Sequence, residues 1–269
     1  MTSRIEQNVN VNGATLHACI EGREGAPWLV LVHSLGTDSQ LWDGQTSVFG
    51  KEYRVLRYDI RGHGHSSAPK GPYTMDQLGD DLFGLLAHFA IPRTHVVGIS
   101  LGALTALAVA ERNAPQIASI AVCDSRADMP VEFAQAIDER NRLIRKEGMA
   151  AIAQAMVERW ITPATIAARP EVAEKVRQMV KKASVEGFAS CTEAIKSNRL
   201  LERLSQIKVP SIFVAADQDA GLPIEVMQRM QQNVPGSRLA VIAGGGHLSN
   251  LDQPDAFNRL VLEFLRNLP

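Results

Sequence analysis

The chain has 269 residues, enough for one sizeable hydrophobic core, and its shares of hydrophobic residues (45%) and charged residues (21%) are those of an ordinary globular protein. The formal net charge of -1 provides no strong field for nucleic acid or for a membrane surface, so we expect neither as a partner. The three cysteines, Cys19, Cys123 and Cys191, are too few and too scattered for a disulfide framework or a metal cluster.

The N-terminal segment and the hydropathy of the chain bear on where the protein acts. The opening MTSRIEQNVNVNG has no apolar stretch after a basic start, so we expect no signal peptide. No apolar run is long enough to span a membrane, and the scattered cysteines fit a reducing compartment. We therefore expect a cytoplasmic protein that acts on a small molecule and needs no cofactor.

Short apolar runs rich in β-branched residues alternate with helical stretches in the first part of the chain. The segment Met75–Phe89 is predicted to be a helix, because its leucines recur at helical spacing. This alternation predicts an α/β fold with a mostly parallel sheet that helices cover on both faces. The runs predicted as strands are Trp28–Val32, Tyr53–Tyr58, Thr94–Val97 and Ile117–Cys123.

The middle of the chain has a different pattern. Residues 126–204 show helical periodicity and no convincing strand, as in Met149–Trp160. Strands and helices then alternate again. We predict an α/β core formed by residues 1–125 and 205–269, with residues 126–204 inserted as a helical lid over the carboxyl ends of the strands. The later core elements are predicted at Ser211–Ala215, Ile224–Asn233, Leu239–Ile242 and Ala256–Asn267.

The strongest local signal is the segment Gly98–Gly102, GISLG, which has the form G-x-S-x-G. It follows a predicted strand and opens a helix, and this is the context that a nucleophile elbow requires. The tight turn strains the backbone of the serine and leaves no room for bulk two residues away. We therefore predict that Ser100 is an exposed nucleophile at a helix N-terminus. The plainer alternative is a turn with a capping serine.

A serine nucleophile needs a base, and His247 is the histidine best placed to provide it. It follows the last predicted strand in the glycine-rich segment Ala243–His247, which exposes the imidazole. Enzymes with this elbow carry the acid and then the histidine after the serine, which selects His247. The other histidines lie in or beside predicted strands or helices, or precede the serine: His17, His33, His63, His65, His88 and His95.

The acid that orients His247 is expected after the strand that precedes the histidine loop. Two aspartates, Asp217 and Asp219, stand there, and a loop carboxylate can reach the imidazole and stabilise its charged form. We predict Asp219, because its distance from the strand end and the following Pro223 fit the usual loop. The alternative for either residue is a solvated turn aspartate.

An oxyanion hole needs two preorganised N–H donors. We predict the backbone N–H of Leu101, the residue after the serine, as one donor. The other is expected in the loop His33–Gly36 after the strand Trp28–Val32, and Leu35 is the candidate.

A second motif, DIRGHGHS at Asp59–Ser66, combines an aspartate with two histidines. Its spacing lacks the usual zinc pattern, and the carboxylate leads into a turn. We predict a hydrogen-bonded loop that supports the site, and no metal.

Longer segments carry a family pattern that extends over nearly the whole chain. They are HSLGTDSQLWD (His33–Asp43), YDIRGHGHSSAP (Tyr58–Pro69), GPYTMDQLGDDL (Gly71–Leu82), ERWITP (Glu158–Pro163), EGFASCTEAI (Glu186–Ile195) and GGGHLSNLDQPDAF (Gly244–Phe257). Together with the elbow, they resemble the 3-oxoadipate enol-lactone hydrolases of the α/β-hydrolase superfamily. The resemblance implies an eight-stranded, mostly parallel sheet with an inserted lid, and a serine hydrolase that opens a small lactone or ester.

The chain also departs from that family. Glycine is usual where Ala103 and Ala216 stand. The segment Cys123–Asp128, where the core leads into the lid, is more charged than in these lactonases. Because this segment faces the expected entry of substrate, a related lactone or ester remains open as the substrate.

Two residues are candidates for contact with the substrate. A carboxylated substrate would need a cation, for which Arg126 is the candidate, unless it forms a surface salt bridge with Asp124 or Asp128. Trp160 is predicted to line the pocket from the lid or to be plain core. The same elbow would also suit hydrolysis of carbon–carbon bonds in β-diketone-like acids, peracid formation, or a receptor that retains these residues.

Overall fold

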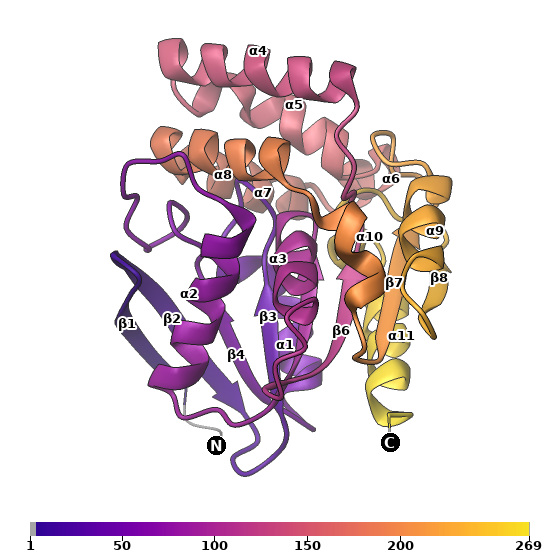
Figure 1. The fold of residues 1–269 in the computed structure, drawn as a ribbon. Coiled ribbons are helices and arrows are strands. Elements are labelled where there is room, and N and C mark those ends of the chain that lie inside the picture. Colours follow the sequence, from indigo (N-terminus) through magenta and orange to yellow (C-terminus); the bar gives the residue numbers. More distant parts are fainter. Residues whose placement is uncertain (1–3, 269) are drawn as a thin grey trace.

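An eight-stranded sheet forms the centre of the structure, a computed structural model that describes residues 4–268 (Figure 1). Its strands are β1 (Ile5–Val11), β2 (Ala14–Gly22), β3 (Trp28–Val32), β4 (Arg54–Tyr58), β5 (Thr94–Ile99), β6 (Ile117–Cys123), β7 (Ser211–Ala216) and β8 (Arg238–Ile242). The order across the sheet is β1-β2-β4-β3-β5-β6-β7-β8. β2 pairs antiparallel with β1 and β4, and all other pairs are parallel, which confirms the predicted mostly parallel sheet.

β1 and β2 form a hairpin at the edge of the sheet. The sequence analysis did not predict these two strands, because they are not continuous apolar runs. In β1 asparagines alternate with valines, so that Val9 and Val11 are buried while the asparagines remain exposed. The turn residues Asn12 and Gly13 have φ values of 46° and 76°, as a type I′ turn requires. The Asn-Gly pair between two alternating runs is therefore the signal that predicts this hairpin.

Helices cover both faces of the sheet. α3 (Leu101–Ala110) is buried along its whole length and packs on β3, β5 and β6. α2 (Met75–His88) packs against α3, and both lie in front of the sheet in Figure 1. α1 (Asp43–Phe49) packs against α11 (Pro254–Arg266), and α9 (Ile224–Gln232) packs on β7 and β8. None of the helices within residues 4–268 combines the length and the hydropathy that crossing a membrane requires.

Five consecutive helices between β6 and β7 lie over one end of the sheet (Figure 1). They are α4 (Val131–Glu147), α5 (Ala150–Trp160), α6 (Pro163–Ala168), α7 (Pro170–Lys182) and α8 (Val185–Ser197). Prolines occupy the first positions of α6 and α7, where the missing N–H has no cost. Since the chain enters α4 from the end of β6, the helices cover the carboxyl ends of the parallel strands.

The predicted elements differ from the observed ones mainly at their ends. β5 continues two residues beyond the predicted Val97, because its pairing with β6 extends to Ile99 and Cys123. Ser100 therefore follows the last residue of the strand directly. α11 begins at Pro254, two residues before the predicted start.

Candidate active site

Ser100 lies in a strained turn between β5 and α3. Its φ of 55° and ψ of -114° are unfavourable for any residue with a side chain. The turn is possible because both flanking glycines lack a Cβ. A Cβ at Gly98 would overlap the backbone of Gly102, and a Cβ at Gly102 would overlap the carbonyl of Val32. The predicted elbow is present, and it presents the serine hydroxyl at the N-terminus of α3.

A line of hydrogen bonds connects Ser100 with His247 and Asp219. The Ser100 hydroxyl lies 2.9 Å from Nε2 of His247, and Nδ1 of His247 lies 2.6 Å from Oδ2 of Asp219. An ionised carboxylate only accepts hydrogen bonds, so Nδ1 carries the imidazole proton. This leaves the lone pair of Nε2 free to accept the proton of the serine hydroxyl.

Burial and charge act in opposite directions on this pair. Burial raises the pKa of Asp219, but the charge of His247 and its hydrogen bond, together with the Gly221 N–H at 2.9 Å, hold it below the ordinary value. Burial lowers the pKa of His247, but Asp219 outweighs this effect, so the net pKa is raised above 6.5. The arrangement therefore favours a positive charge on His247 once it has taken a proton.

Asp217, the other candidate acid, has a different partner. Its Oδ1 accepts a hydrogen bond of 2.7 Å from the backbone N–H of Gly244, and the residue is exposed. Asp217 therefore joins the end of β7 to the loop that follows β8. Of the two aspartates, the structure brings Asp219 to His247.

Leu35 and Leu101 line the same pocket as Ser100. Within residues 4–268 neither backbone N–H donates a hydrogen bond to a protein acceptor. Both side chains are buried, which keeps the two backbone segments in place. Two unused donors beside a serine hydroxyl are the arrangement that an oxyanion hole needs.

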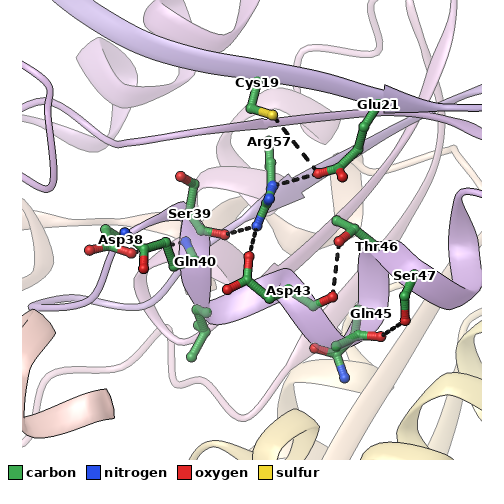
Figure 2. Close-up of polar contacts among 12 residues, drawn as sticks. Cys19, Glu21, Asp38, Ser39, Gln40, Asp43, Gln45, Thr46, Ser47 and Arg57 are labelled. Atoms are coloured by element: carbon green, nitrogen blue, oxygen red, sulfur yellow. Dashed lines mark hydrogen bonds and ion pairs between the residues drawn. The ribbon is translucent and has the colours of Figure 1, made fainter. Parts of the chain in front are cut away.

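The loop that carries Leu35 is fixed by buried polar contacts (Figure 2). Arg57 of β4 donates a hydrogen bond of 3.0 Å to the carbonyl of Ser39 and forms ion pairs with Glu21 and Asp43. Asp59 accepts a hydrogen bond of 2.7 Å from the N–H of Ser39. The loop is therefore held from the sheet side.

The DIRGHGHS motif supplies one of these contacts, through Asp59, and is itself tied to the fold by further hydrogen bonds. Besides the bond to Ser39, the Asp59 carboxylate accepts one of 2.8 Å from the N–H of His65. Arg61 forms a buried double hydrogen bond with Asp81, with both distances 2.6 Å. The motif thus has the supporting role that the sequence predicts.

The loop of His247 is tied to the helical segment above the sheet. The N–H of Leu248 donates to the carbonyl of Trp160 at 3.0 Å. The buried carboxylate of Asp252 accepts from the N–H of Gly246 at 2.8 Å and from the hydroxyl of Thr162 at 3.1 Å. The ring of Trp160 is stacked on His247, with 6.3 Å between the ring centres. The end of α5 therefore forms part of the support of His247.

A pocket with about 670 Å³ of empty space, partly open to solvent, lies above Ser100. Its lining is mainly apolar, with three arginines. The lining residues from the helical segment are Phe133, Ile137, Arg140, Met156, Arg159, Trp160, Thr192 and Ile195, and Arg126 precedes it.

Arg126 lines the pocket but has a carboxylate partner. Its Nε lies 2.9 Å from Oδ1 of Asp128, which also pairs with Arg229. Of the two salt-bridge partners predicted for Arg126, Asp128 is the one that it contacts. Asp124, the other partner considered, is fully buried.

Sequence reasoning missed two further arginines of the pocket, Arg140 and Arg159. Within residues 4–268 neither has a carboxylate within ion-pair distance. Burial and the neighbouring charge of Arg159 together lower the pKa of Arg140 to about 10, and burial is the larger cause. A signal for Arg140 was present, since it continues the helical stripe of Phe133 and Ile137 on α4.

Comparisons with known proteins agree with this fold. The family described as "Alpha/beta hydrolase family" matches residues 29–260. The chain is 37% identical to 3-oxoadipate enol-lactonase 2 of Acinetobacter baylyi over 95% of this chain and 92% of that protein. It is 31% identical to 3-oxoadipate enol-lactonase 1 of the same organism, over 96% of both. The crystal structure of the enol-lactonase from Burkholderia xenovorans LB400 is similar with a TM-score of 0.93 and 37% identity, covering 97% of this chain and 100% of that one.

Proposed function

The chain belongs to the alpha/beta hydrolase family, and we propose that it is a serine hydrolase that opens a small lactone or carboxylic ester through an acyl-enzyme. The observation that carries the proposal is the hydrogen-bonded line from Ser100 through His247 to Asp219. The substrate we favour is 3-oxoadipate enol-lactone, after which two relatives are named.

In the proposed reaction, Ser100 attacks the carbonyl carbon while His247 takes the hydroxyl proton. The backbone N–H groups of Leu35 and Leu101 stabilise the negative oxygen of the tetrahedral intermediate. His247 then protonates the leaving oxygen, which is an enol when the substrate is an enol-lactone. A water molecule, deprotonated by His247, releases the acyl group and restores Ser100.

We further propose that α4–α8, within residues 126–204, act as a lid that supplies the charge for an anionic substrate. 3-Oxoadipate enol-lactone bears one free carboxylate. Arg140 and Arg159 line the pocket without a carboxylate partner, whereas Arg126 already has Asp128. A substrate carboxylate would relieve the repulsion between the two unpaired arginines, and Trp160 would cover His247.

Replacing Arg140 tests the recognition of charge. In Arg140→Met, KM for a carboxylate-bearing lactone should rise about 10- to 100-fold, the loss expected for one hydrogen bond to a charged group, and kcat should change little. KM for a neutral aryl ester should not rise. Steady-state kinetics on both substrates provide the measurement, and Arg142→Met, an exposed position on the same helix, is the matched control. Equal losses on both substrates would exclude a role in carboxylate binding.

The pH profile tests His247 as the base. Because proton transfer needs the neutral imidazole, kcat/KM should fall as the pH drops through the pKa of His247. Asp219 raises this pKa, so the midpoint should lie above 6.5, and Asp219→Asn should move it to lower pH. The measurement is kcat/KM for a neutral ester between about pH 5 and 9. A wild-type midpoint well below 6.5 would contradict the assignment.

A small substrate panel tests the reaction class. It contains an enol-lactone, saturated lactones, short aryl esters and a β-diketone acid. We expect turnover of the enol-lactone and weaker turnover of the esters. Turnover of only the β-diketone acid would replace the proposal by carbon–carbon bond hydrolysis. If a fluorophosphonate fails to label Ser100 in the folded protein, the proposed serine hydrolase mechanism is excluded.

A further inference from the structure

A second carboxyl group, that of Asp124, lies beside the proposed catalytic residues and has no role in the reaction described above. Asp124 directly follows β6, and its N–H donates to the carbonyl of Val214 in the neighbouring strand β7. The residue has no solvent exposure and adopts a φ of 45°, an unusual conformation for a residue with a side chain. Its position is therefore fixed by the sheet.

The two carboxyl oxygens of Asp124 differ in their contacts. Oδ2 accepts hydrogen bonds from the hydroxyl of Ser249 at 2.5 Å and from its N–H at 3.4 Å. Oδ1 is buried and has no hydrogen-bond partner within residues 4–268. A buried carboxyl with one oxygen unpaired is costly, so packing alone does not account for an aspartate at this position.

Ser249 connects Asp124 to the proposed base. It begins α10 (Ser249–Asp252), two residues after His247. The Asp124–Ser249 contact therefore holds the loop of His247 from the β6 side, while Asp219 holds the imidazole from the β7 side. The two aspartates approach one histidine from the ends of two adjacent strands.

We propose that Asp124 is a positioning residue for His247: it fixes the histidine loop through Ser249, and as a carboxylate it assists Asp219 in stabilising the imidazolium. This inference rests on the proposed function. His247 remains the only group that moves a proton to or from Ser100, and Asp124 acts on it without touching the substrate.

The charges around Asp124 agree with this role. The pKa of Asp124 is raised to about 8. Burial is the largest cause and Asp219 adds to it, whereas the Ser249 hydrogen bond and the charge of His247 oppose the rise. Asp124 in turn raises the pKa of His247, which Arg159 of α5 lowers. The adjacent thiol of Cys123 has a pKa well above its ordinary value, because it is buried, and stays neutral. A proton on His247 thus favours the Asp124 carboxylate, and an ionised Asp124 favours the proton on His247.

The first test compares Asp124→Asn with the wild type on a neutral ester. The asparagine keeps the shape and a hydrogen-bonding group for Ser249 but cannot ionise. We expect the low-pH midpoint of kcat/KM to move to lower pH and kcat to fall several-fold with little change in KM. A loss of thermal stability with an unchanged midpoint would overturn the proposal, because a purely structural aspartate would give that result.

The second test removes Asp219, so that Asp124 is the remaining acid beside His247. The residual rate of Asp219→Ala should increase with pH as Asp124 loses its proton, with a midpoint below about 8, because the charge of Asp219, which raises the pKa of Asp124, is absent. In the double variant with Asp124→Asn this increase should disappear, and the rate should fall about tenfold or more. Equal rates and profiles for the single and double variants would also overturn the proposal.

Ser249→Ala keeps the test decisive if Asp124→Asn does not fold. Losing the hydroxyl removes a bond that favours the carboxylate, so Asp124 stays neutral and the midpoint should again move to lower pH. An unchanged midpoint contradicts the proposal. Failure of the proposed function is distinguishable, because the wild type would then hydrolyse no ester and a fluorophosphonate would leave Ser100 unlabelled.

Discussion

Ser100→Ala should lower kcat for an enol-lactone or aryl ester by about 10⁶-fold, because the nucleophile of the proposed acyl-enzyme is lost. KM and the melting temperature should change little, since among residues 4–268 the hydroxyl bonds to His247 alone. The substitution removes a single oxygen atom and leaves the pocket intact. Turnover measured at high enzyme concentration, together with thermal unfolding, provides the test.

His247→Ala, alone and combined with Ser100→Ala, tests whether the two residues act together. Residues that act as a unit give losses that do not add, so the double variant should be about as slow as either single one. A Ser100→Ala protein that retains a rate within tenfold of the wild type would show that another nucleophile or a water molecule attacks the substrate. Independent, additive losses would contradict a shared proton-transfer step.

Asp219→Asn should lower kcat by about 10⁴-fold. The asparagine amide would donate to Nδ1 of His247 or leave it without a charged partner, so the tautomer that can accept the serine proton would lose its support. Asp217→Asn is the matched control, since Asp217 follows the same strand but bonds to Gly244. The control should stay within a few-fold of the wild type. Both variants are compared by kcat on one neutral ester.

A reversed result, with Asp217→Asn inactive and Asp219→Asn active, would assign the acid to the other aspartate. Nearly equal, small losses would instead indicate that a different carboxylate serves His247. The double variant of Asp219→Ala with Asp124→Asn would then decide whether Asp124 is that carboxylate. The melting temperatures of both proteins separate these outcomes from loss of folding.

The elbow could be predicted from the sequence because its causes are local. A buried strand, two glycines that avoid steric overlap and a helix start all lie within Thr94–Ala110. The glycine-rich loop of His247 is likewise visible in the sequence. The structure brings Asp219 to His247 and Asp217 to Gly244, and this difference depends on how two loops from β7 and β8 approach each other.

The pocket was harder to predict, because its lining comes from helices whose mutual packing leaves little trace in the sequence. Arg140 lies on an apolar stripe, yet its lack of a carboxylate partner becomes visible only when α4 and α5 are brought together. The role of Asp124 is hidden for the same reason, since Ser249 is 125 residues away. The charge pattern within one segment therefore suggested Arg126 as the cation for the substrate. Its partner Asp128 is only two residues further along the chain.

The bonds between the end of α5 and the histidine loop have a consequence for how this enzyme can change its substrate range. Trp160 is bonded to Leu248, and Thr162 is linked to Gly246 through Asp252, so we expect substitutions that widen the pocket at the end of α5 to displace His247 as well. Phe133, Ile137 and Arg140 on α4 have no such bond to that loop. New specificities should therefore arise by variation in α4, where the pocket can be reshaped while the position of His247 is preserved.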